Sequence, residues 1–416
     1  MVKNNMTVLK TQQNIPSGWI VKKMDDFIKE GSISLGRGEV ISKNDIKDFP
    51  GENPIYSSSV KKNALFGTYS KYMFDEELIT WSVDGGGDFF YRPRHKFSVT
   101  NVSGYMNVNQ KEFDYKFLAY YLQEEHSKKY FDYQHKAHPS VIRELYEVAK
   151  PPIKEQQKIA EILGTVEEDI TKTEGVIEAT EKLKRGLMQQ LFTHGIGHTK
   201  FKETKIGQIP EEWEVGGFNS LVNAKDKNAI KPGPFGSALK KSFYVEKGFK
   251  IYGQEQVISG DASYGNYYVN EDKYKELEGF KVDAGDILIS LVGTIGKILI
   301  VPDSFEKGII NPRLLKITPD KKRADSQFTA HLLKSDFLIQ QMNQKSHGGT
   351  MNILNKGMLM SVEFGVPSLK EQQKIAEILS TIDEKISINK KLKAKLTLLK
   401  KGLMQDLLNG KVRVTT

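Results

Sequence analysis

Apolar residues recur every three or four positions along two long segments of the chain. In the first segment they are Ile159, Leu163, Val166, Ile170, Ile177, Leu187 and Leu191, and in the second Ile375, Leu379, Ile382, Ile386, Leu396, Leu403 and Leu407. This spacing places apolar side chains on one face of an α-helix. We therefore predict two amphipathic helices of about 39 residues, each roughly 58 Å long.

The two segments are copies of each other. Lys154–Leu163 is repeated letter for letter as Lys370–Leu379, and Gly186–Gln189 as Gly402–Gln405, with the same offset in both cases (370 − 154 = 402 − 186). No residue has been inserted or deleted between these stretches. This is expected of a helix, in which one extra residue rotates the apolar face by about 100°.

Each predicted helix has clear ends and needs a partner. Proline precedes both segments, at Pro151-Pro152 and Pro367, and glycine follows them at Gly195 and Gly410. Two apolar stripes of equal length can bury each other. In a parallel pair, the linker Thr193–Gln208 would have to span the helix length, and its roughly 53–58 Å reach barely suffices. We therefore predict an antiparallel coiled coil.

Two polar residues, Thr173 and Asn389, interrupt the apolar stripes at matching positions. In an antiparallel pair they meet near the midpoint, across a pseudo-twofold axis, and a polar pair at an apolar seam fixes the register. The residues predicted to pair the helices are Ile159, Leu163, Val166, Ile170, Thr173 and Ile177 in the first helix, and Ile375, Leu379, Ile382, Ile386, Asn389 and Leu396 in the second.

The sequence that precedes each helix follows one strand pattern. Leu78–Gly87 and Ile287–Gly296 each read as a short strand that runs into a glycine turn, and further strands are predicted around Phe97–Val102 and Ile309–Ile317. A similar order of strands in two regions indicates a domain that was duplicated and has diverged.

Short amphipathic helices, Phe117–Leu122 and Phe328–Leu333, follow these strands. The predicted fold class is α+β: two similar mixed α/β domains and two long antiparallel coiled-coil helices, related by a pseudo-twofold axis. The predicted division is a first domain over 1–150, a first helix over 151–194, a linker and second domain over 195–366, and a second helix and tail over 367–416.

The composition is that of a folded, basic protein. The 416 residues are 38% hydrophobic and 27% charged, with a net charge of +9, which suits a polyanionic partner. No cysteine is present, so disulfides and thiolate metal sites are excluded. The first residues lack an apolar core typical of a signal peptide, and glycine, serine and lysine break the apolar stretch Ile287–Val301. We expect a soluble, cytoplasmic protein.

Several patterns that suggest chemistry are incomplete. Gly293–Ile298 superficially suggests a phosphate loop but has the wrong glycine spacing, and no Ser or Thr follows its lysine. Asn311–Leu314 lacks the second proline and the aromatic residue of an adenine methyltransferase motif. Metal-like spacing without a third ligand is found in two histidine pairs, His135 with His138 and His194 with His198. We predict no catalytic residue and no metal site in this chain.

Basic residues interleaved with aromatic residues remain as candidate chemistry. In the first domain they are Arg92, Arg94 and Lys96 beside Phe89–Tyr91, and in the second Lys231, Lys240 and Lys241 near Phe235. Such loops can bind phosphates and read base edges. The alternative is that they are solvated charges beside core aromatics.

The whole chain resembles one known family, the specificity subunits of Type I restriction–modification enzymes. Pro151–Leu163 and Pro367–Leu379 are similar to the conserved regions of that family, and Gly233–Ser237 and Gly285–Ile289 to motifs of its target recognition domains. The resemblance implies that each domain reads one half of a bipartite double-stranded DNA site, while the helices measure the spacer. It also implies two methyltransferase subunits docked on the solvent-facing sides of the helices, and restriction–translocase subunits that join them.

The resemblance assigns all cofactors to the partners: S-adenosylmethionine for adenine methylation, and ATP and Mg²⁺ for translocation and cleavage. The residues predicted to contact DNA lie in loops of both domains. They are Ser58, Lys61, Lys62, Asp84, Arg92, Arg94, Lys96 and His138 in the first, and Ser237, Lys240, Lys241, Gln254, Thr294, Lys297, Arg313 and Asn352 in the second.

Two other classes of function stay open at this point. One is a stand-alone nuclease or methyltransferase with an unrecognised catalytic site, and the other is a coiled-coil adaptor that recruits proteins without reading DNA. If the purified chain cleaved or methylated DNA without partners, the stand-alone enzyme would be favoured. If reversing the charges of the loop lysines and arginines left the function of the complex intact, the adaptor would be favoured.

Overall fold

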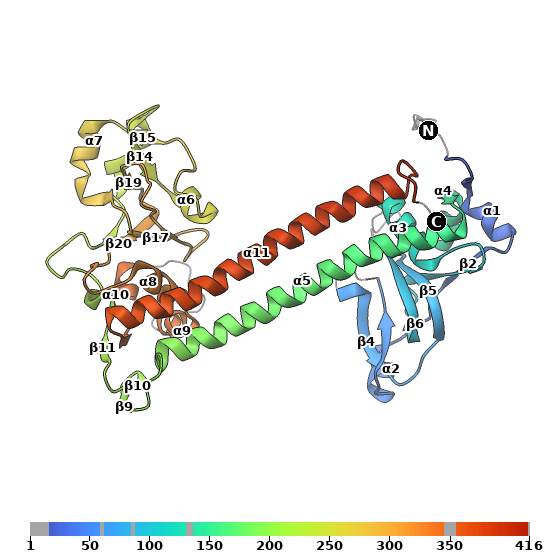
Figure 1. Ribbon diagram of the computed structural model, residues 1–416, viewed down its shortest axis with the longest axis horizontal. Helices are drawn as coiled ribbons and strands as arrows, with labels where there is room; N and C mark the ends of the chain where they lie inside the picture. Colours follow the sequence, from blue (N-terminus) through green and yellow to red (C-terminus); the bar gives the residue numbers. More distant parts are fainter. Residues whose placement is uncertain (1–15, 59–61, 85–87, 130–135, 345–354, 415–416) are drawn as a thin grey trace. The chain divides into compact units, whose positions relative to one another are not determined.

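The computed structural model describes residues 16–58, 62–84, 88–129, 136–344 and 355–414 (Figure 1). The chain forms two compact units. Unit 1 is Met1–Glu174 with Lys391–Thr416, and unit 2 is Gly175–Lys390. The two predicted long helices are confirmed as α5 (Ile153–Thr193) and α11 (Leu369–Leu407). Each of them gives one part to unit 1 and the other part to unit 2.

A six-stranded sheet with strand order β2-β7-β5-β6-β3-β4 dominates unit 1. Its strands are β2 (Ile33–Arg37), β3 (Asn53–Tyr56), β4 (Leu65–Tyr69), β5 (Phe74–Ser82), β6 (Phe89–Val99) and β7 (Ser103–Val108). Neighbours pair antiparallel except β3 and β6. The ring of Phe74 lies 4.8 Å from that of Tyr105, although Tyr105 pairs with Thr80. The sheet therefore curls over on itself, as strongly twisted sheets do.

Short helices and a two-stranded ribbon complete unit 1. The helices are α1 (Met24–Lys29), α2 (Lys43–Asp48), α3 (Tyr115–Ser127) and α4 (Pro139–Leu145), and β1 (Ile20–Lys23) pairs antiparallel with β8 (Glu147–Lys150). The predicted helix at Phe117–Leu122 is confirmed within α3, whose N-cap Asp114 accepts a hydrogen bond from the Phe117 amide (2.8 Å). The core of unit 1 includes residues of both long helices and their ends, among them Leu163 and Leu408.

The described residues of unit 2 form two larger sheets. The first, in the order β12-β20-β17-β18, consists of β12 (Ile230–Pro232), β17 (Ile287–Ser290), β18 (Ile298–Ile300) and β20 (Leu314–Ile317). The second, in the order β13-β15-β14-β19-β16, consists of β13 (Tyr244–Val245), β14 (Phe249–Tyr252), β15 (Tyr268–Val269), β16 (Lys281–Val282) and β19 (Gly308–Ile310). Among the described strands of unit 2, only β14 and β19 pair parallel.

Short helices and two further strand pairs complete the described part of unit 2. The helices are α6 (Gln254–Ser259), α7 (Glu271–Glu276), α8 (Ser326–Leu333), α9 (Asp336–Gln344) and α10 (Lys356–Met360). The strand pairs are β9 (Phe201–Thr204) with β10 (Gly207–Pro210), and β11 (Glu214–Gly216) with β21 (Phe364–Val366). The helix predicted at Phe328–Leu333 is confirmed as part of α8.

Two strand predictions extend too far. The strand predicted at Phe97–Val102 ends at Val99, because a turn follows in which the Ser103 amide donates to the Thr100 carbonyl (2.9 Å). The strand predicted at Ile309–Ile317 is two strands, β19 and β20, which belong to different sheets. A turn at Asn311 separates them: its side-chain oxygen accepts from the Arg313 amide (2.9 Å), and Pro312 follows it directly.

The long helices run antiparallel within each unit (Figure 1). In unit 1, Glu174 pairs with Lys393 (2.6 Å) and Glu167 with Lys400 (2.8 Å), so one residue number falls as the other rises. In unit 2, Glu181 pairs with Lys390 (2.7 Å) and Lys184 with Asp383. Surface ion pairs are worth little individually, but their order along the helices fixes the direction.

The predicted seam residues differ in burial. Ile159, Leu163, Ile375 and Leu379 are fully buried, but they pack into the cores of the globular parts as well as facing the other long helix. Thr173, Ile177 and Ile386 are buried, and the remaining predicted seam residues, Val166, Ile170, Ile382, Asn389 and Leu396, are half-buried. Thr173 and Asn389 each donate a hydrogen bond to a carbonyl of their own helix, at Asp169 (2.7 Å) and Lys385 (2.8 Å). That they meet across the seam stays a prediction.

Candidate nucleic-acid interface

Four short segments, one of them the start of α6, converge at one place in unit 2, and Asn311 is at their centre. Gly233 lies so close to Asn311 that an added Cβ would be 1.9 Å from the Asn311 carbonyl oxygen, so only glycine fits there. The Asn311 amide donates to the Tyr252 carbonyl (2.8 Å), the side chain of Gln254 donates to the Val292 carbonyl, and the Leu291 amide donates to the Arg313 carbonyl (2.9 Å). These four segments, 233–239, 253–256, 291–297 and 311–313, are called loop cluster 2.

Loop cluster 2 and the residues that adjoin it carry an exposed set of cations. Lys297 and Arg313 lie within the cluster, and Lys240 and Lys241 follow its first segment directly. All four side chains are exposed, and no described residue forms an ion pair with any of them. Unpaired cations on rigid loops are suited to phosphate binding.

The other predicted contact residues of unit 2 are placed as follows. Ser237 and Thr294 are exposed within loop cluster 2, whereas Gln254 is half-buried and its side-chain amide already donates to Val292. Asn352 lies outside the described residues.

A second set of loops converges in unit 1. The Thr100 hydroxyl donates to the Ser57 hydroxyl (2.9 Å), the Val83 amide to the Val102 carbonyl (2.9 Å), and the Ala137 amide to the Val83 carbonyl (3.0 Å). The described residues of these segments, 57–58, 83–84, 100–102 and 136–138, are called loop cluster 1.

Three predicted residues lie in loop cluster 1. Asp84 pairs with the Lys136 ammonium (2.7 Å). His138 is the N-cap of α4, where its Nδ1 accepts from the Ser140 amide (3.3 Å), and Ser58 is half-buried. Lys61 lies outside the described residues, and only the backbone of Lys62 is described.

Arg94 and Lys96 lie apart from loop cluster 1, along β6. Their strand register places Lys96 opposite Asp75 of β5, and the Arg94 guanidinium is 3.6 Å from the same carboxylate. Both side chains are exposed. They offer positive charge on a strand rather than on the converging loops.

Arg92 is a correction to the sequence-based prediction of a DNA contact. Its side chain is only 1% exposed, stacks at 3.6 Å on the Tyr56 ring, and donates to the Thr80 hydroxyl (2.9 Å) and the Asn63 side chain (2.9 Å). Burial lowers the pKa of Arg92 to about 10. Arg92 thus holds Asn63, whose backbone is left-handed (φ 55°), and its guanidinium is enclosed and does not face solvent.

Asp286, in the stretch predicted to be a recognition-domain motif, is also buried. Its carboxylate is 3.7 Å from the buried ammonium of Lys316 and accepts from the Asp283 amide (2.8 Å). Burial raises the pKa of Asp286, against the opposing effect of Lys316. This motif therefore stabilises the sheet that carries loop cluster 2.

The repeated Lys-Glu-Gln-Gln stretch anchors each long helix to the unit in which it begins. Gln156 is fully buried: its side-chain nitrogen donates to the carbonyls of Glu112 (2.9 Å) and Pro151 (2.8 Å), and its oxygen accepts from the Asp114 amide (2.9 Å). Gln372 makes the equivalent three bonds in unit 2, to Arg323, Pro367 and Asp325. The second glutamine of each pair, Gln157 or Gln373, is exposed.

The glutamate before each buried glutamine accepts a hydrogen bond from a tryptophan side chain. The indole N–H of Trp19 donates to Glu155 (3.2 Å), and that of Trp213 donates to Glu371 (2.9 Å). Glu155 is also bound by both ends of the Arg413 fork (2.6 and 2.8 Å), whereas Glu371 is 2.9 Å from Nε2 of His198. His198, one of the histidine pair His194 and His198 considered as a metal site, thus binds the glutamate at the start of α11.

A third repeated contact joins α3 and α8 to the long helices. Tyr120 of α3 donates to Glu167, and at the equivalent place on α8, His331 has Nδ1 3.8 Å from Asp383. His331 is buried, and its Nδ1 has no hydrogen-bond partner among the described residues. Burial, together with the neighbouring Lys184, lowers the pKa of His331 to about 4.

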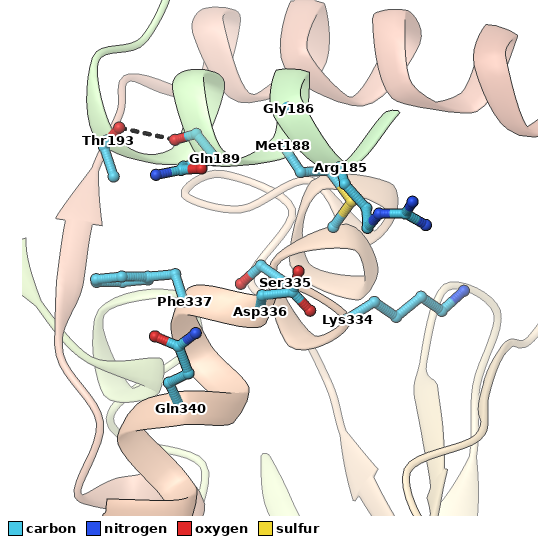
Figure 2. A pocket seen from close by; sticks show the side chains of 10 residues that line it. All are labelled: Arg185, Gly186, Met188, Gln189, Thr193, Lys334, Ser335, Asp336, Phe337 and Gln340. Carbon is cyan, nitrogen blue, oxygen red and sulfur yellow. Dashed lines mark hydrogen bonds between the residues drawn. The ribbon is translucent and has the colours of Figure 1, made fainter. Parts of the chain in front are cut away.

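A cavity of about 450 Å³ lies in unit 2 between the last turns of α5 and the start of α9 (Figure 2). Its lining includes the cations Arg185 and Lys334, the apolar Met188 and Phe337, and Asp336. Gly186, in the repeated Gly-Leu-Met-Gln stretch, has nothing near the place where a Cβ would be. The mixed lining suits a protein side chain better than a single class of small molecule.

Comparison with known proteins agrees with this architecture. The sequence model of the family described as "Type I restriction modification DNA specificity domain" matches residues 16–181 and 210–398. The MjaVIII specificity subunit of a Type I restriction enzyme from Methanocaldococcus jannaschii is 27% identical, over 96% of this chain and 94% of that protein. The chain belongs to the family of Type I restriction–modification specificity subunits.

Solved structures share the fold. The crystal structure of a Type-I restriction-modification S subunit from M. genitalium has a TM-score of 0.60 at 20% identity, covering 96% of this chain and 98% of that one. A chain from a structural study of complex assembly in a type I restriction–modification system has a TM-score of 0.54 at 14% identity, covering 96% and 99%.

The described residues contain neither a membrane-spanning helix nor a metal-binding group. None of their helices is both long and apolar enough to cross a membrane. They also contain no group of three or more histidine, aspartate or glutamate residues that could hold a metal ion.

The exposure of Phe235 and the central place of Asn311 were not predicted from sequence. Phe235 is highly exposed beside the cations of loop cluster 2, and the Gly-Pro pair before it was the available signal. Asn311 organises that cluster through its backbone. In the sequence, Asn311 stands within the incomplete motif Asn311–Leu314, and the Asn-Pro pair, which marks a turn, was the available signal.

Proposed function

We propose that the chain reads an asymmetric, bipartite DNA site, with loop cluster 1 at one half-site and loop cluster 2 at the other. The observation that carries this proposal is the contrast between the anchors and the loops. Gln156 and Gln372 make the same three bonds in the two units, while the charges of the loop clusters differ. Lys297 and Arg313 of loop cluster 2 are exposed with no ion pair among the described residues, whereas Asp84 of loop cluster 1 pairs with Lys136. A repeated scaffold that carries two different sets of loops is suited to two different half-sites.

The long helices would set the spacer between the half-sites and bind two methyltransferase subunits. Exposed apolar residues support two equivalent docking surfaces: Val176 and Leu183 on α5 in unit 2, and Leu392 and Leu399 on α11 in unit 1. The two pairs are related by the offset of the sequence repeat (392 − 176 = 399 − 183). Residues seven apart lie on nearly the same helix face, so each pair forms a short apolar stripe that one copy of the same partner can cover.

The cavity of unit 2 extends this docking surface. It lies beside Gly186, three residues after Leu183 on the same helix. We infer that a side chain of the methyltransferase subunit enters it. Leu183→Lys should weaken binding of one methyltransferase copy at least tenfold in titrations of the assembled complex, whereas Ile258→Lys, an exposed apolar position on α6, should not change it.

The chemistry of the complex belongs to the partners in this proposal. Methyltransferase subunits would use S-adenosylmethionine to methylate adenine, and restriction–translocase subunits would use ATP and Mg²⁺. This chain would contribute recognition and position, so its variants should change which sites are methylated and leave the chemical step itself unchanged.

Mapping of adenine methylation in cells that carry this chain with its methyltransferase tests the proposal. Methylation is expected at one bipartite sequence with two unlike halves and a fixed spacer. Exchange of the described loop cluster 2 segments for those of a relative should change one half-site only. Methylation without a sequence pattern, or unaltered by the exchange, would contradict DNA reading and favour an adaptor.

A further inference from the structure

Phe235 is the most exposed large apolar side chain of the described residues, at 82% of its accessible surface. Burying a phenylalanine is worth about 1.5–3 kcal/mol relative to leaving it exposed. The free protein forgoes that stabilisation here, although hydrophobic cores lie close by in the same unit. Such a residue indicates a contact made on binding.

The ring is presented by a backbone that is held on both sides. Before it, the Gly233 amide donates to the Leu314 carbonyl (2.8 Å) with no room for a side chain, and Pro234 is buried. After it, the Phe235 carbonyl accepts from the Ala238 amide (3.2 Å), and Leu239 is buried in a small core. The phenylalanine therefore projects from a fixed turn.

The surroundings of Phe235 are polar and positive. Ser237, Lys240 and Lys241 follow it and are all exposed, and Arg313 is exposed next to the segment that Gly233 contacts. A protein-binding anchor is typically the centre of an apolar patch with few charges. One apolar ring among unpaired cations matches a nucleic acid instead, whose phosphates pair with the cations and whose bases accept a ring.

We propose that Phe235 is a wedge that enters the base stack of the half-site read by unit 2. This inference rests on the proposed function and identifies the residue that deforms the DNA. Insertion of an apolar side chain costs partial unstacking, which is lowest at flexible pyrimidine–purine steps. Phe235 would therefore favour particular base steps through their deformability, without a hydrogen bond to any base.

The assembled complex with its methyltransferase provides the test. Phe235→Ala should weaken binding to the cognate duplex by about 5- to 150-fold, the range of one base–aromatic contact. Phe235→Leu, which keeps an apolar wedge, should retain most of the affinity. Phe201→Ala, which removes a partly exposed phenylalanine from β9, is the matched control and should bind as the unaltered chain does.

Binding to duplexes that contain an abasic nucleotide distinguishes insertion of Phe235 into the base stack from an ordinary surface contact. An abasic nucleotide placed in turn at each position of the half-site should tighten binding at one step, because less stacking has to be broken there. That gain should vanish in Phe235→Ala and persist in Phe235→Leu. A 2-aminopurine at the same step should brighten on binding of the unaltered chain but not on binding of Phe235→Ala.

Three outcomes would overturn the inference. One is that Phe235→Ala binds the cognate duplex within twofold of the unaltered chain, and another is that no step shows an abasic gain. The third is that Phe235→Ala loses methyltransferase subunits, which would make the ring a protein contact. In all three the unaltered chain still prefers cognate over scrambled DNA; loss of that preference would instead refute the proposed function.

Discussion

Replacement of Gln156 by methionine should destabilise unit 1 by about 2–6 kcal/mol, the combined cost of three backbone groups that lose their hydrogen-bond partner. The variant has a similar volume, but the carbonyls of Pro151 and Glu112 and the amide of Asp114 are left unpaired. The bond to Pro151 is buried, and an unsatisfied buried carbonyl costs about 1–3 kcal/mol. The other two bonds are partly accessible to water, and each contributes about 0.5–1.5 kcal/mol.

Tryptophan fluorescence during urea and thermal unfolding can measure this destabilisation in unit 1 alone. The chain has three tryptophans, and Trp213→Phe leaves Trp19 and Trp81, both in unit 1. In that background Gln156→Met should lower the melting temperature by at least about 4 °C, since 1 kcal/mol corresponds to about 2–4 °C for a unit of this size. Gln157→Met, one residue along and exposed, is the control.

A difference below about 0.5 kcal/mol between the two variants, the size of an ordinary surface substitution, would refute this reasoning. It would mean that water or a small shift of α3 satisfies the three groups, so that the repeated glutamine does not anchor the helix. The same comparison in unit 2, with Gln372→Met against Gln373→Met, should give a similar difference because the three bonds are equivalent.

Four further predictions follow from the same contacts. Burial lowers the pKa of His331 to about 4, so the unfolded chain binds a proton at this histidine at higher pH than the folded chain does. The free energy of unfolding of unit 2 should therefore fall by up to about 3 kcal/mol between about pH 6.5 and pH 4. Urea unfolding of His331→Gln should not show this fall. Lys316→Met should destabilise unit 2 by about 3 kcal/mol in thermal unfolding, because the Asp286 carboxylate stays buried without its cation. Lys240→Gln with Lys241→Gln should reduce the slope of log affinity against log salt by about 1 for each phosphate that is no longer neutralised, measured on cognate DNA. Four residues inserted into α5 should change the spacer or prevent assembly, while methylation mapping finds the same half-site bases.

Each of these predictions has a control or a contradicting result. His194→Gln, at an exposed histidine, should leave the pH dependence unchanged, and a loss that persists in His331→Gln would assign it to another group. Lys316→Met combined with Asp286→Asn should recover stability relative to Lys316→Met alone. An unchanged salt slope would remove Lys240 and Lys241 from the interface, and altered half-site bases after the insertion would contradict the spacer role.

The long helices could be predicted from sequence because their signals are local. The spacing of Ile159 and Leu163 defines one face, and the matching spacing of Ile375 and Leu379 shows that the length is kept. Helices α3 and α8 were predictable for the same reason. The strand predicted at Ile309–Ile317 was too long, because the apolar pattern continues through the turn at Asn311 while the chain crosses between sheets.

The candidate site was less predictable, because burial and convergence of loops depend on distant residues. Arg92 has the same sequence context as Arg94, yet the curled sheet encloses it beneath Tyr56. Loop cluster 2 depends on the close approach of Gly233 to Asn311, which are far apart in the chain. A basic residue beside aromatics predicts either a cation–π contact in the core or a phosphate contact, and sequence alone does not choose between them.

The contacts that differ between the two units show where divergence is tolerated. The buried glutamines and the Trp–Glu pairs are identical: each glutamine satisfies the same three backbone groups, and each tryptophan donates to the glutamate before it. One step outward, Tyr120 is replaced by His331, which lies 3.8 Å from the equivalent carboxylate without a hydrogen bond to it, and the Arg413 fork is replaced by His198, which contacts Glu371. In the loop clusters the charged residues differ, with Lys297 and Arg313 in unit 2 and Asp84 and Lys136 in unit 1. The two units therefore differ more in residues and contacts as the distance from the start of each long helix grows. The half-site that a unit reads can thus change without altering how that unit is anchored.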